Sequence, residues 1–246
     1  MLQSVISLQQ KKSMKTEETN RRSGDQEICQ DLSEKIIHLT YMPGEALSEH
    51  ELAARYGATR HTIRKALAVL QQKHLIEVYP QRGTYVTLLD IDQVKNIMFL
   101  RAAAEIQAAN LLMDQEDTVI AENCRIMENC IQSQKMAMQE AGDGQLTEGF
   151  ETSDAQFHAQ LFRAVGRETA CHMLDDEMNL FYRWRNLELR LNDRLPEIIH
   201  QHEELLQMLK NREREGFRQL MNQHIDTNYF EEIGARTNNR YFYKKS

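Results

Sequence analysis

The chain has 246 residues, of which 41% are hydrophobic and 27% are charged, so it can bury a core in each of two ordinary globular domains. No window approaches the length and hydrophobicity of a membrane span, and the four cysteines form no CxxC pair. The chain also begins without an apolar signal region. We therefore expect a cytoplasmic protein with reduced thiols and no membrane partner.

The net charge of -7 is unevenly divided along the chain. Residues 1–89 carry 12 Lys and Arg against 10 Asp and Glu, whereas residues 90–246 carry 18 against 27. From Arg55 to Arg82 the balance is clearly basic, since six Lys and Arg residues are accompanied by one acid, Glu77. A local basic cluster neutralises phosphates even in an acidic molecule, so the first part of the chain is a candidate DNA-binding domain.

The first elements predicted along the chain are those of a helix-turn-helix. Residues 1–25 are polar and predict a flexible tail, while apolar residues at helical spacing predict a helix over residues 26–39. Ser48 precedes Glu51 by three residues, the spacing of a capping box, and predicts a short helix that ends at Gly57. Thr59 can cap another helix that runs to about Lys73. Two short helices joined by a glycine turn are typical of a helix-turn-helix.

Two β-prone runs, residues 75–79 and 84–88, follow on either side of Pro80-Gln81-Arg82-Gly83 and predict a two-stranded wing. Beyond Asp90 the pattern is helical, with breaks predicted near Asp114, residues 141–145, Gly166, residues 192–196 and Asn211. These breaks leave about six helices, enough for a bundle. The predicted fold is mostly α, with a winged helix-turn-helix domain over residues 26–89, an all-helical domain over residues 90–235 and a polar tail over residues 236–246.

The second helix of the predicted helix-turn-helix carries basic side chains on the face opposite its apolar residues: Arg60, His61 and Arg64. Arginine can bind both major-groove acceptors of a guanine. Gly83 at the wing tip lets the backbone approach a groove closely, and Arg82 beside it can reach a phosphate or the minor groove. The alternative is that these charges form only a solvated helix face.

The run from Leu32 to Val86, with PGEALSEHELAARYGATRHTIRKALAVLQQKHLIEVYPQRGTYV at its centre, resembles the winged helix of GntR-family regulators. That family has Leu-Ser-Glu-x-x-Leu-Ala after a Pro-Gly, then Ser/Thr-Arg-x-x-x-Arg-x-Ala-Leu and an Arg-Gly-Thr-x-Val wing. The resemblance implies an operator of double-stranded DNA, with His50 where many members carry a phosphate-binding arginine. The predicted DNA-binding residues are His50, Thr59, Arg60, His61, Thr62, Arg64, Arg82 and Gly83.

Four residues of the acidic part are candidate metal ligands. Asp154 and His158 are four apart, so on a helix they share the face that Leu161 continues into the core. A carboxylate and an imidazole that point into the core of a helical bundle lose their hydration, and a divalent metal ion can compensate for this loss. His202 and His224 also lie beside apolar stripes, and three imidazoles with one carboxylate suit Zn²⁺, Ni²⁺ or Mn²⁺. The alternative is a set of hydrogen-bonded core histidines.

This part also resembles the helical FCD ligand-binding domain of FadR-type members, through four short motifs: Arg101-x-x-x-Glu105, Asp154-x-x-Phe157-His158, His202-Glu-Glu-Leu-Leu and Met221-Asn-Gln-His224. The metal ligands of such members map onto Asp154, His158, His202 and His224. The resemblance further implies a small organic acid as effector, bound against the metal and met by arginines.

The candidate effector-binding residues are Arg101, then Arg183 and Arg185 beside the only tryptophan, Trp184. Arg101 could instead form a salt bridge with Glu105, which follows it by four residues. The other two arginines could instead belong to an exposed helix face or a subunit contact.

Together these features predict a homodimeric transcription regulator, by family habit a repressor, and not an enzyme. The effector would change the separation of two recognition helices that read a short palindrome. Two other functions stay open. One is a metal-dependent enzyme acting on a small acid, although no clear general base accompanies the four ligands. The other is an architectural DNA-binding protein without sequence preference.

Overall fold

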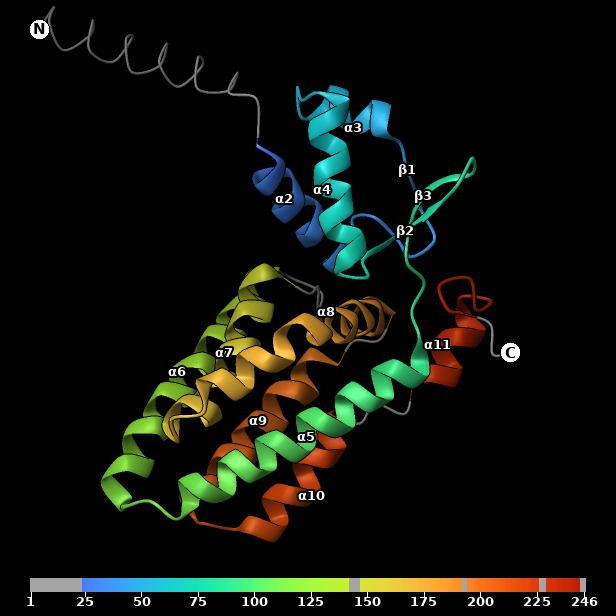
Figure 1. Ribbon diagram of the computed structural model, residues 1–246. Helices are drawn as coiled ribbons and strands as arrows, with labels where there is room; N and C mark the ends of the chain where they lie inside the picture. The colour runs from blue at the N-terminus through green and yellow to red at the C-terminus, as the bar shows by residue number, and fades with distance from the viewer. Residues whose placement is uncertain (1–23, 142–146, 192–193, 226–228, 244–246) are drawn as a thin grey trace, which may run out of the picture. The chain divides into compact units, whose positions relative to one another are not determined.

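The computed structural model describes residues 24–141, 147–191, 194–225 and 229–243 (Figure 1). The chain divides into two compact units, one of residues up to Ile36 together with Thr40–Thr87, the other of Ile37–Leu39 and the residues from Leu88 on. Most of the predicted N-terminal tail, residues 1–23, lies outside the described residues, and Asp25 already begins the first described helix.

Three helices form the first unit: α2 (Asp25–Ile37), α3 (Glu49–Arg55) and α4 (Arg60–Gln72). Both predicted caps are confirmed, since Ser48 accepts a hydrogen bond from the N–H of Glu51 and Thr59 accepts one from the N–H of Thr62. These bonds satisfy backbone donors that the first turn of a helix otherwise leaves unpaired. The helices bury one apolar face each, chiefly through Ile28, Leu32, Ile36, Leu52, Ile63, Leu67 and Leu70.

A small antiparallel sheet completes the first unit, with β1 (Ala46–Leu47), β2 (Ile76–Tyr79) and β3 (Gly83–Val86) in the order β1-β3-β2. The predicted wing is confirmed as the β2–β3 hairpin, in which Ile76 pairs with Val86 and Tyr79 with Gly83. The third strand was not predicted, because two residues are too few to show an alternating pattern.

The described part of the second unit contains seven helices: α5 (Ile91–Met113), α6 (Asp117–Ala141), α7 (Glu148–Ala164), α8 (Glu168–Leu191), α9 (Leu195–Lys210), α10 (Arg214–Ile225) and α11 (Phe230–Arg236). The predicted breaks near Asp114, Gly166 and Asn211 each separate two of these helices. Of the predicted breaks at residues 141–145 and 192–196, residues 142–145 and 192–193 lie outside the described residues, and the second break falls between the end of α8 at Leu191 and the start of α9 at Leu195. The short α11 adds one helix to the six expected.

The second unit is a helical bundle. Helix α6 packs against α7 and α9, α10 packs against α9 and α5, and α5 also contacts α7 and α8. Helix α5 turns one face toward these neighbours, and that face includes two charged residues, Arg101 and Glu105, which are buried. None of the described helices is long and apolar enough to cross a membrane.

The C-terminal residues depart from the predicted polar tail of residues 236–246. Tyr241 and Phe242 are buried, and Phe242 forms a parallel β-bridge with Leu89. Phe242 also lies 6.1 Å from Trp184, measured between ring centroids. The prediction was wrong over residues 236–243 because two aromatic side chains among polar neighbours are enough to anchor so short a segment.

The Ser48 cap gives a first test of the helix-turn-helix. We expect Ser48→Ala to lower the free energy of unfolding of the first unit by about 1 kcal/mol, since the first turn of α3 loses the acceptor for the N–H of Glu51. Urea unfolding followed by circular dichroism measures the change. The control is Ser133→Ala on α6, whose hydroxyl bonds a carbonyl of its own helix. An equal loss in both variants would contradict the capping role.

Candidate metal centre and nucleic-acid interface

Helix α4 presents one apolar and one basic face. Its N-terminal residues Arg60, His61 and Arg64 are exposed, while Ile63 and Leu67 are buried. Thr62 is half-buried, and its hydroxyl lies 2.8 Å from that of Thr59, so both threonines shape the start of the helix. The basic face thus begins at the end of α4 that a recognition helix inserts into the major groove.

On this basic face Arg64 forms an ion pair with Glu49 of α3. Its Nε lies 3.1 and 2.9 Å from the two carboxylate oxygens of Glu49, yet the Arg64 side chain remains 66% exposed. Exposed pairs of this kind contribute little to stability. A guanine or a phosphate can therefore replace Glu49 as the partner of Arg64 at small cost. His50, also on α3, is exposed.

The tip of the wing is built around Gly83, which has a φ of 119° that favours glycine over residues with a side chain. Arg82 and Gly83 are both exposed, and the hydroxyl of Tyr85 donates a hydrogen bond to the carbonyl of Arg82. This bond fixes the backbone of the tip. The predicted DNA-binding residues therefore fall into two groups, one at the start of α4 with α3 and one at the wing.

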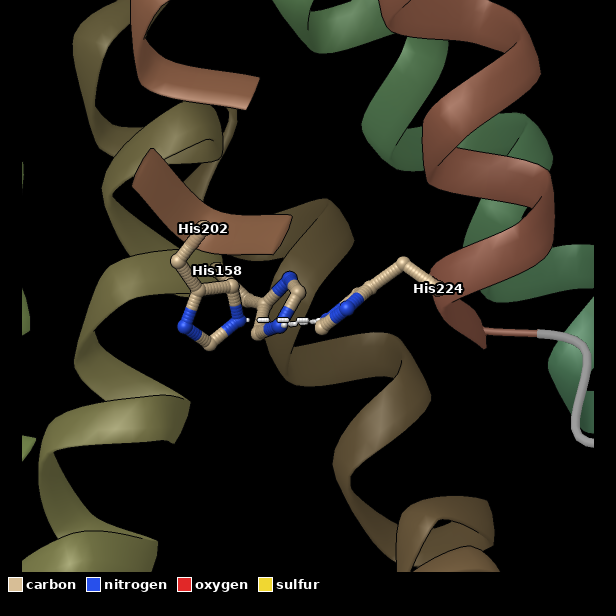
Figure 2. A group of neighbouring side chains, drawn as sticks. All are labelled: His158, His202 and His224. Carbon is tan, nitrogen blue, oxygen red and sulfur yellow. Dashed lines mark hydrogen bonds between the residues drawn. The ribbon is translucent and has the colours of Figure 1, made fainter. Parts of the chain in front are cut away.

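Three histidines meet inside the bundle (Figure 2): His158 from α7, His202 from α9 and His224 from α10. All three are buried. The Nε2 atom of His224 lies 3.1 Å from that of His202 and 3.2 Å from that of His158. Three helices thus bring equivalent ring nitrogens to one point, and these nitrogens could hold a metal ion.

The other nitrogen of each ring, Nδ1, faces a side-chain oxygen: Glu105 Oε2 for His158 at 2.5 Å, Gln134 Oε1 for His202 at 2.9 Å and Gln201 Oε1 for His224 at 2.8 Å. A neutral imidazole that donates from Nδ1 has an unprotonated Nε2. The three Nε2 lone pairs then converge on one another. A cation between them turns this repulsion into ligation, and such oxygen partners are usual for metal-binding histidines.

Asp154 adds an oxygen to this group. Its Oδ1 lies 3.6 Å from Nε2 of His202, is buried, and has no hydrogen-bond partner among the described residues. A buried carboxylate oxygen without a partner is costly unless a cation binds it. The structure therefore brings together all four residues that the sequence singled out as ligands.

The electrostatic surroundings suit ligation by neutral histidines. Burial lowers the pKa of His202 to about 3, although the negative charge of Asp154 raises it, and the positive charges of Arg185 and Arg101 lower it further. Burial also holds the pKa of His224 well below its ordinary value. Both rings are therefore neutral near neutral pH, as metal binding requires.

Arg101 lies close to the histidines but is engaged with Glu105, as the alternative interpretation of the sequence had it. The Nε of Arg101 donates to Glu105 Oε1 at 2.6 Å, and both side chains are buried. Burial raises the pKa of Glu105, but its contacts with His158 and with the charged Arg101 outweigh this effect and bring the pKa to about 2. Glu105 therefore stays ionised and joins Arg101 to His158.

The role of Glu105 was missed in the sequence, because the only visible signal was its spacing from Arg101. Its contact with His158 spans 53 residues of sequence and depends on how α5 packs against α7. Gln134 and Gln201 were missed for the same reason. The type of side chain alone does not distinguish them from surface glutamines.

Arg183 and Arg185 are both buried on α8, so the alternative of an exposed helix face was wrong. Two residues apart on a helix, they point in different directions. Arg185 lies 3.4 Å from Glu188 and is close enough to the histidines to affect their pKa values. Burial lowers the pKa of Arg183 to about 10, an effect opposed by Tyr243 near the C-terminus. Arg185, and not Arg183, is thus among the charges that lower the pKa values of His202 and His224.

Comparison with known families identifies both units. The profile described as "Bacterial regulatory proteins, gntR family" matches residues 25–86, and that of the FCD domain matches residues 96–227. The chain belongs to the GntR family. Its FCD domain assigns it to the FadR-like subfamily, so it is a DNA-binding transcriptional regulator and not an enzyme.

Individual relatives agree with this assignment. The HTH-type transcriptional repressor RspR of Escherichia coli is 28% identical to this GntR-family chain over 202 residues, which cover 82% of this chain and 85% of RspR. A regulator from an unstable DNA locus of Streptomyces ambofaciens is 30% identical over 188 residues, 76% of each chain. The solved structure of E. coli McbR/YncC has the same fold, with a TM-score of 0.59 and 20% identity, covering 88% of this chain and all 100% of that one.

The buried Arg101–Glu105 pair gives a test of the site's framework. We expect Glu105→Gln to lower the free energy of unfolding of the metal-free protein by about 3–5 kcal/mol, since it leaves the buried charge of Arg101 without a counter-charge. Urea unfolding measures this.

The matched control is Glu122→Gln on α6, which removes the carboxylate from the exposed Arg125–Glu122 pair and should cause no measurable change. Equal stability of Glu105→Gln and the unaltered protein would contradict the buried ion pair.

Proposed function

We propose that this regulator binds a divalent metal ion in its FCD domain and that a small organic acid bound against the metal controls its affinity for operator DNA. The observation that carries the proposal is the convergence of three buried Nε2 atoms beside an unpartnered oxygen of Asp154. Three nitrogens and one oxygen suit Zn²⁺, Ni²⁺ or Mn²⁺ and leave coordination positions for an effector. When bound, the ion would act as a Lewis acid toward that effector.

The buried charges support an acid as the effector. Glu105 is balanced by Arg101, whereas the ion-pair contact of Asp154 among the described residues is with His202, which is neutral near neutral pH. A divalent ion exceeds this single negative charge, and the site would then favour an anion. The acid thereby compensates a charge that the protein itself leaves unbalanced.

Arg185 is the arginine best placed to meet the carboxylate of the effector. Its contact with Glu188 is long, at 3.4 Å, and the other carboxylate oxygen of Glu188 bonds Arg194 at 2.5 Å. Arg101, in contrast, is held by Glu105 at 2.6 Å. An incoming carboxylate would therefore disturb the bonds of Arg185 less than those of Arg101. Arg183 is a weaker candidate, because the charge that affects its pKa is that of Tyr243 near the C-terminus.

For DNA recognition we propose a homodimer in which the α4 helix of each subunit reads one half of a palindrome. Arg60, His61 and Arg64 would meet base edges, the start of α4 and His50 would meet phosphates, and Arg82 with Gly83 would follow the adjacent groove. The name of RspR, a repressor, supports the same role here. The effector acts only if it binds one arrangement of the dimer more tightly than another.

Elemental analysis of untagged protein tests the metal centre. We expect about one divalent ion per chain, and its loss in His202→Ala, because a tetrahedral or larger coordination shell loses one of its nitrogen ligands. The matched control is His200→Ala, two residues away on the same helix but exposed, which should retain the ion. Metal retained by His202→Ala, or lost equally from both variants, would contradict the assignment.

Operator binding tests the α4 surface. We expect Arg64→Ala to weaken binding to an operator obtained by in vitro selection about 10- to 100-fold, since one arginine contact with a guanine contributes about 1–3 kcal/mol. Fluorescence anisotropy measures the affinity, and circular dichroism and metal content should stay unchanged. Arg125→Ala, which removes an exposed, ion-paired arginine from α6, serves as the control and should bind normally. Unaltered affinity of Arg64→Ala would rule out this role.

A further inference from the structure

The C-terminal residues 229–243, here called the strap, lie beyond the residues that the two family profiles match. They are nevertheless well packed. Phe230 stacks on the fully buried Trp184 of α8, with ring centroids 4.2 Å apart and planes inclined by 24°, and Phe242 lies 6.1 Å from the same ring. Trp184 therefore holds both ends of the strap against α8.

The end of the strap is bonded to the beginning of the helical domain. The N–H of Leu89 donates to the carbonyl of Tyr241 at 2.8 Å, and the N–H of Tyr243 donates to the carbonyl of Leu89 at 3.2 Å. Leu89 is itself fully buried. Since both backbone groups of Leu89 are bound to the strap, its position depends on the strap rather than on α5, which begins only at Ile91.

Leu89 lies next to one of the three places where the chain passes from one unit to the other, which follow Ile36, Leu39 and Thr87. Thr87, the last residue of the DNA-binding unit, is anchored within that unit, since its N–H donates to the carbonyl of Leu75 at 3.1 Å and its hydroxyl donates to that of His74 at 2.9 Å. Only Leu88 separates these two anchored residues. Two residues span at most about 7 Å, so the connection has no slack to absorb a shift of Leu89.

The helix that holds the strap also reaches the histidines. Phe181 and Trp184 are three residues apart on α8, and the Phe181 ring lies 4.7 Å from the guanidinium of Arg101, which is bonded to Glu105 and through it to His158. A rotation or shift of α8 that follows ligation of the histidines would therefore move the Trp184 ring, on which Phe230 stacks. Close-packed aromatic contacts of this kind transmit displacement because they do not compress.

We propose that the strap links occupancy of the histidine centre to the DNA-binding unit, by fastening Leu89 to α8 through Trp184, Phe230 and Phe242. The inference rests on the proposed function, because it takes the histidines as the sensing site. Ligation of the histidines changes how α8 holds the strap, and the strap changes the position of Leu89 and of the short connection beside it. The two sites are coupled only if ligation favours one state of the strap over another.

The test uses the full-length protein with Zn²⁺ alone as the probe. Amide exchange at Leu89 and Tyr243, followed by NMR, reports directly on the two bonds of the strap. We expect saturating Zn²⁺ to slow exchange at both amides about tenfold or more, because a ligand that favours the closed strap lowers the population of its open state. Fluorescence of Trp184, the only tryptophan, should change over the same range of Zn²⁺.

Phe242→Ala separates binding from transmission. We expect this variant to bind Zn²⁺ with unaltered affinity, measured by calorimetry, while exchange at Leu89 becomes faster and no longer responds to Zn²⁺. Phe242→Leu keeps most of the apolar volume and should retain part of the response, which decides the question if the alanine variant misfolds. Met136→Ala, which truncates an exposed residue of α6, is the control and should respond like the unaltered protein.

The outcomes distinguish the strap from the metal centre. Zn²⁺ bound by the unaltered protein without any change in exchange at Leu89 would overturn the strap proposal, and so would a full response in Phe242→Ala. If calorimetry instead detects no Zn²⁺ binding to the unaltered protein, the metal centre of the proposed function is wrong and the coupling has no site to start from.

Discussion

Lone pairs of three imidazoles that face one another inside a helical bundle repel unless a cation lies between them. In this protein, side-chain oxygens of Glu105, Gln134 and Gln201 impose this arrangement. They accept hydrogen bonds from the three Nδ1 atoms, so the protons stay on Nδ1 and the Nε2 atoms carry lone pairs. Each oxygen is in turn fixed by its own helix, and Glu105 is kept ionised by Arg101. The geometry of the centre is thus a property of the whole bundle.

The same arrangement explains how a bundle can serve as a sensor. Helices α5, α6, α7, α9 and α10 all contribute a side chain to the histidines or to their oxygen partners, and α8 contributes Arg185 nearby. A ligand at this point contacts elements that are distant in sequence and changes the balance among their packing arrangements. The winged helix, in contrast, is held together by short-range caps and a small sheet.

Local features were predictable from the sequence and contacts between helices were not. The caps at Ser48 and Thr59, the hairpin of the wing and the shared face of Asp154 and His158 all follow from spacings of two to four residues. The spacing of His158, His202 and His224 left a metal site and hydrogen-bonded core histidines as alternatives, and the family resemblance mapped metal ligands onto them. Neither route indicated that Glu105, Gln134 or Gln201 bonds a histidine, because a hydrogen bond between distant segments leaves no periodic signal.

Burial also decided cases that residue type left open. Arg101 pairs with Glu105 rather than standing free for an effector, and Arg183 and Arg185 are buried on different sides of α8. The aromatic residues of the C-terminal segment were predicted to belong to a polar tail, yet Phe242 lies near Trp184 and forms a β-bridge with Leu89. In each case a partner distant in the sequence determined where the side chain lies, and the neighbouring residues gave no indication of that partner.

Anomalous X-ray scattering from crystals of the protein loaded with Zn²⁺ tests the central claim most directly. The account predicts one strong peak at about 2.0–2.2 Å from Nε2 of His158, His202 and His224 and from a carboxylate oxygen of Asp154. Absence of such a peak, with the three rings hydrogen-bonded to water or to one another at full Zn²⁺ concentration, would contradict it.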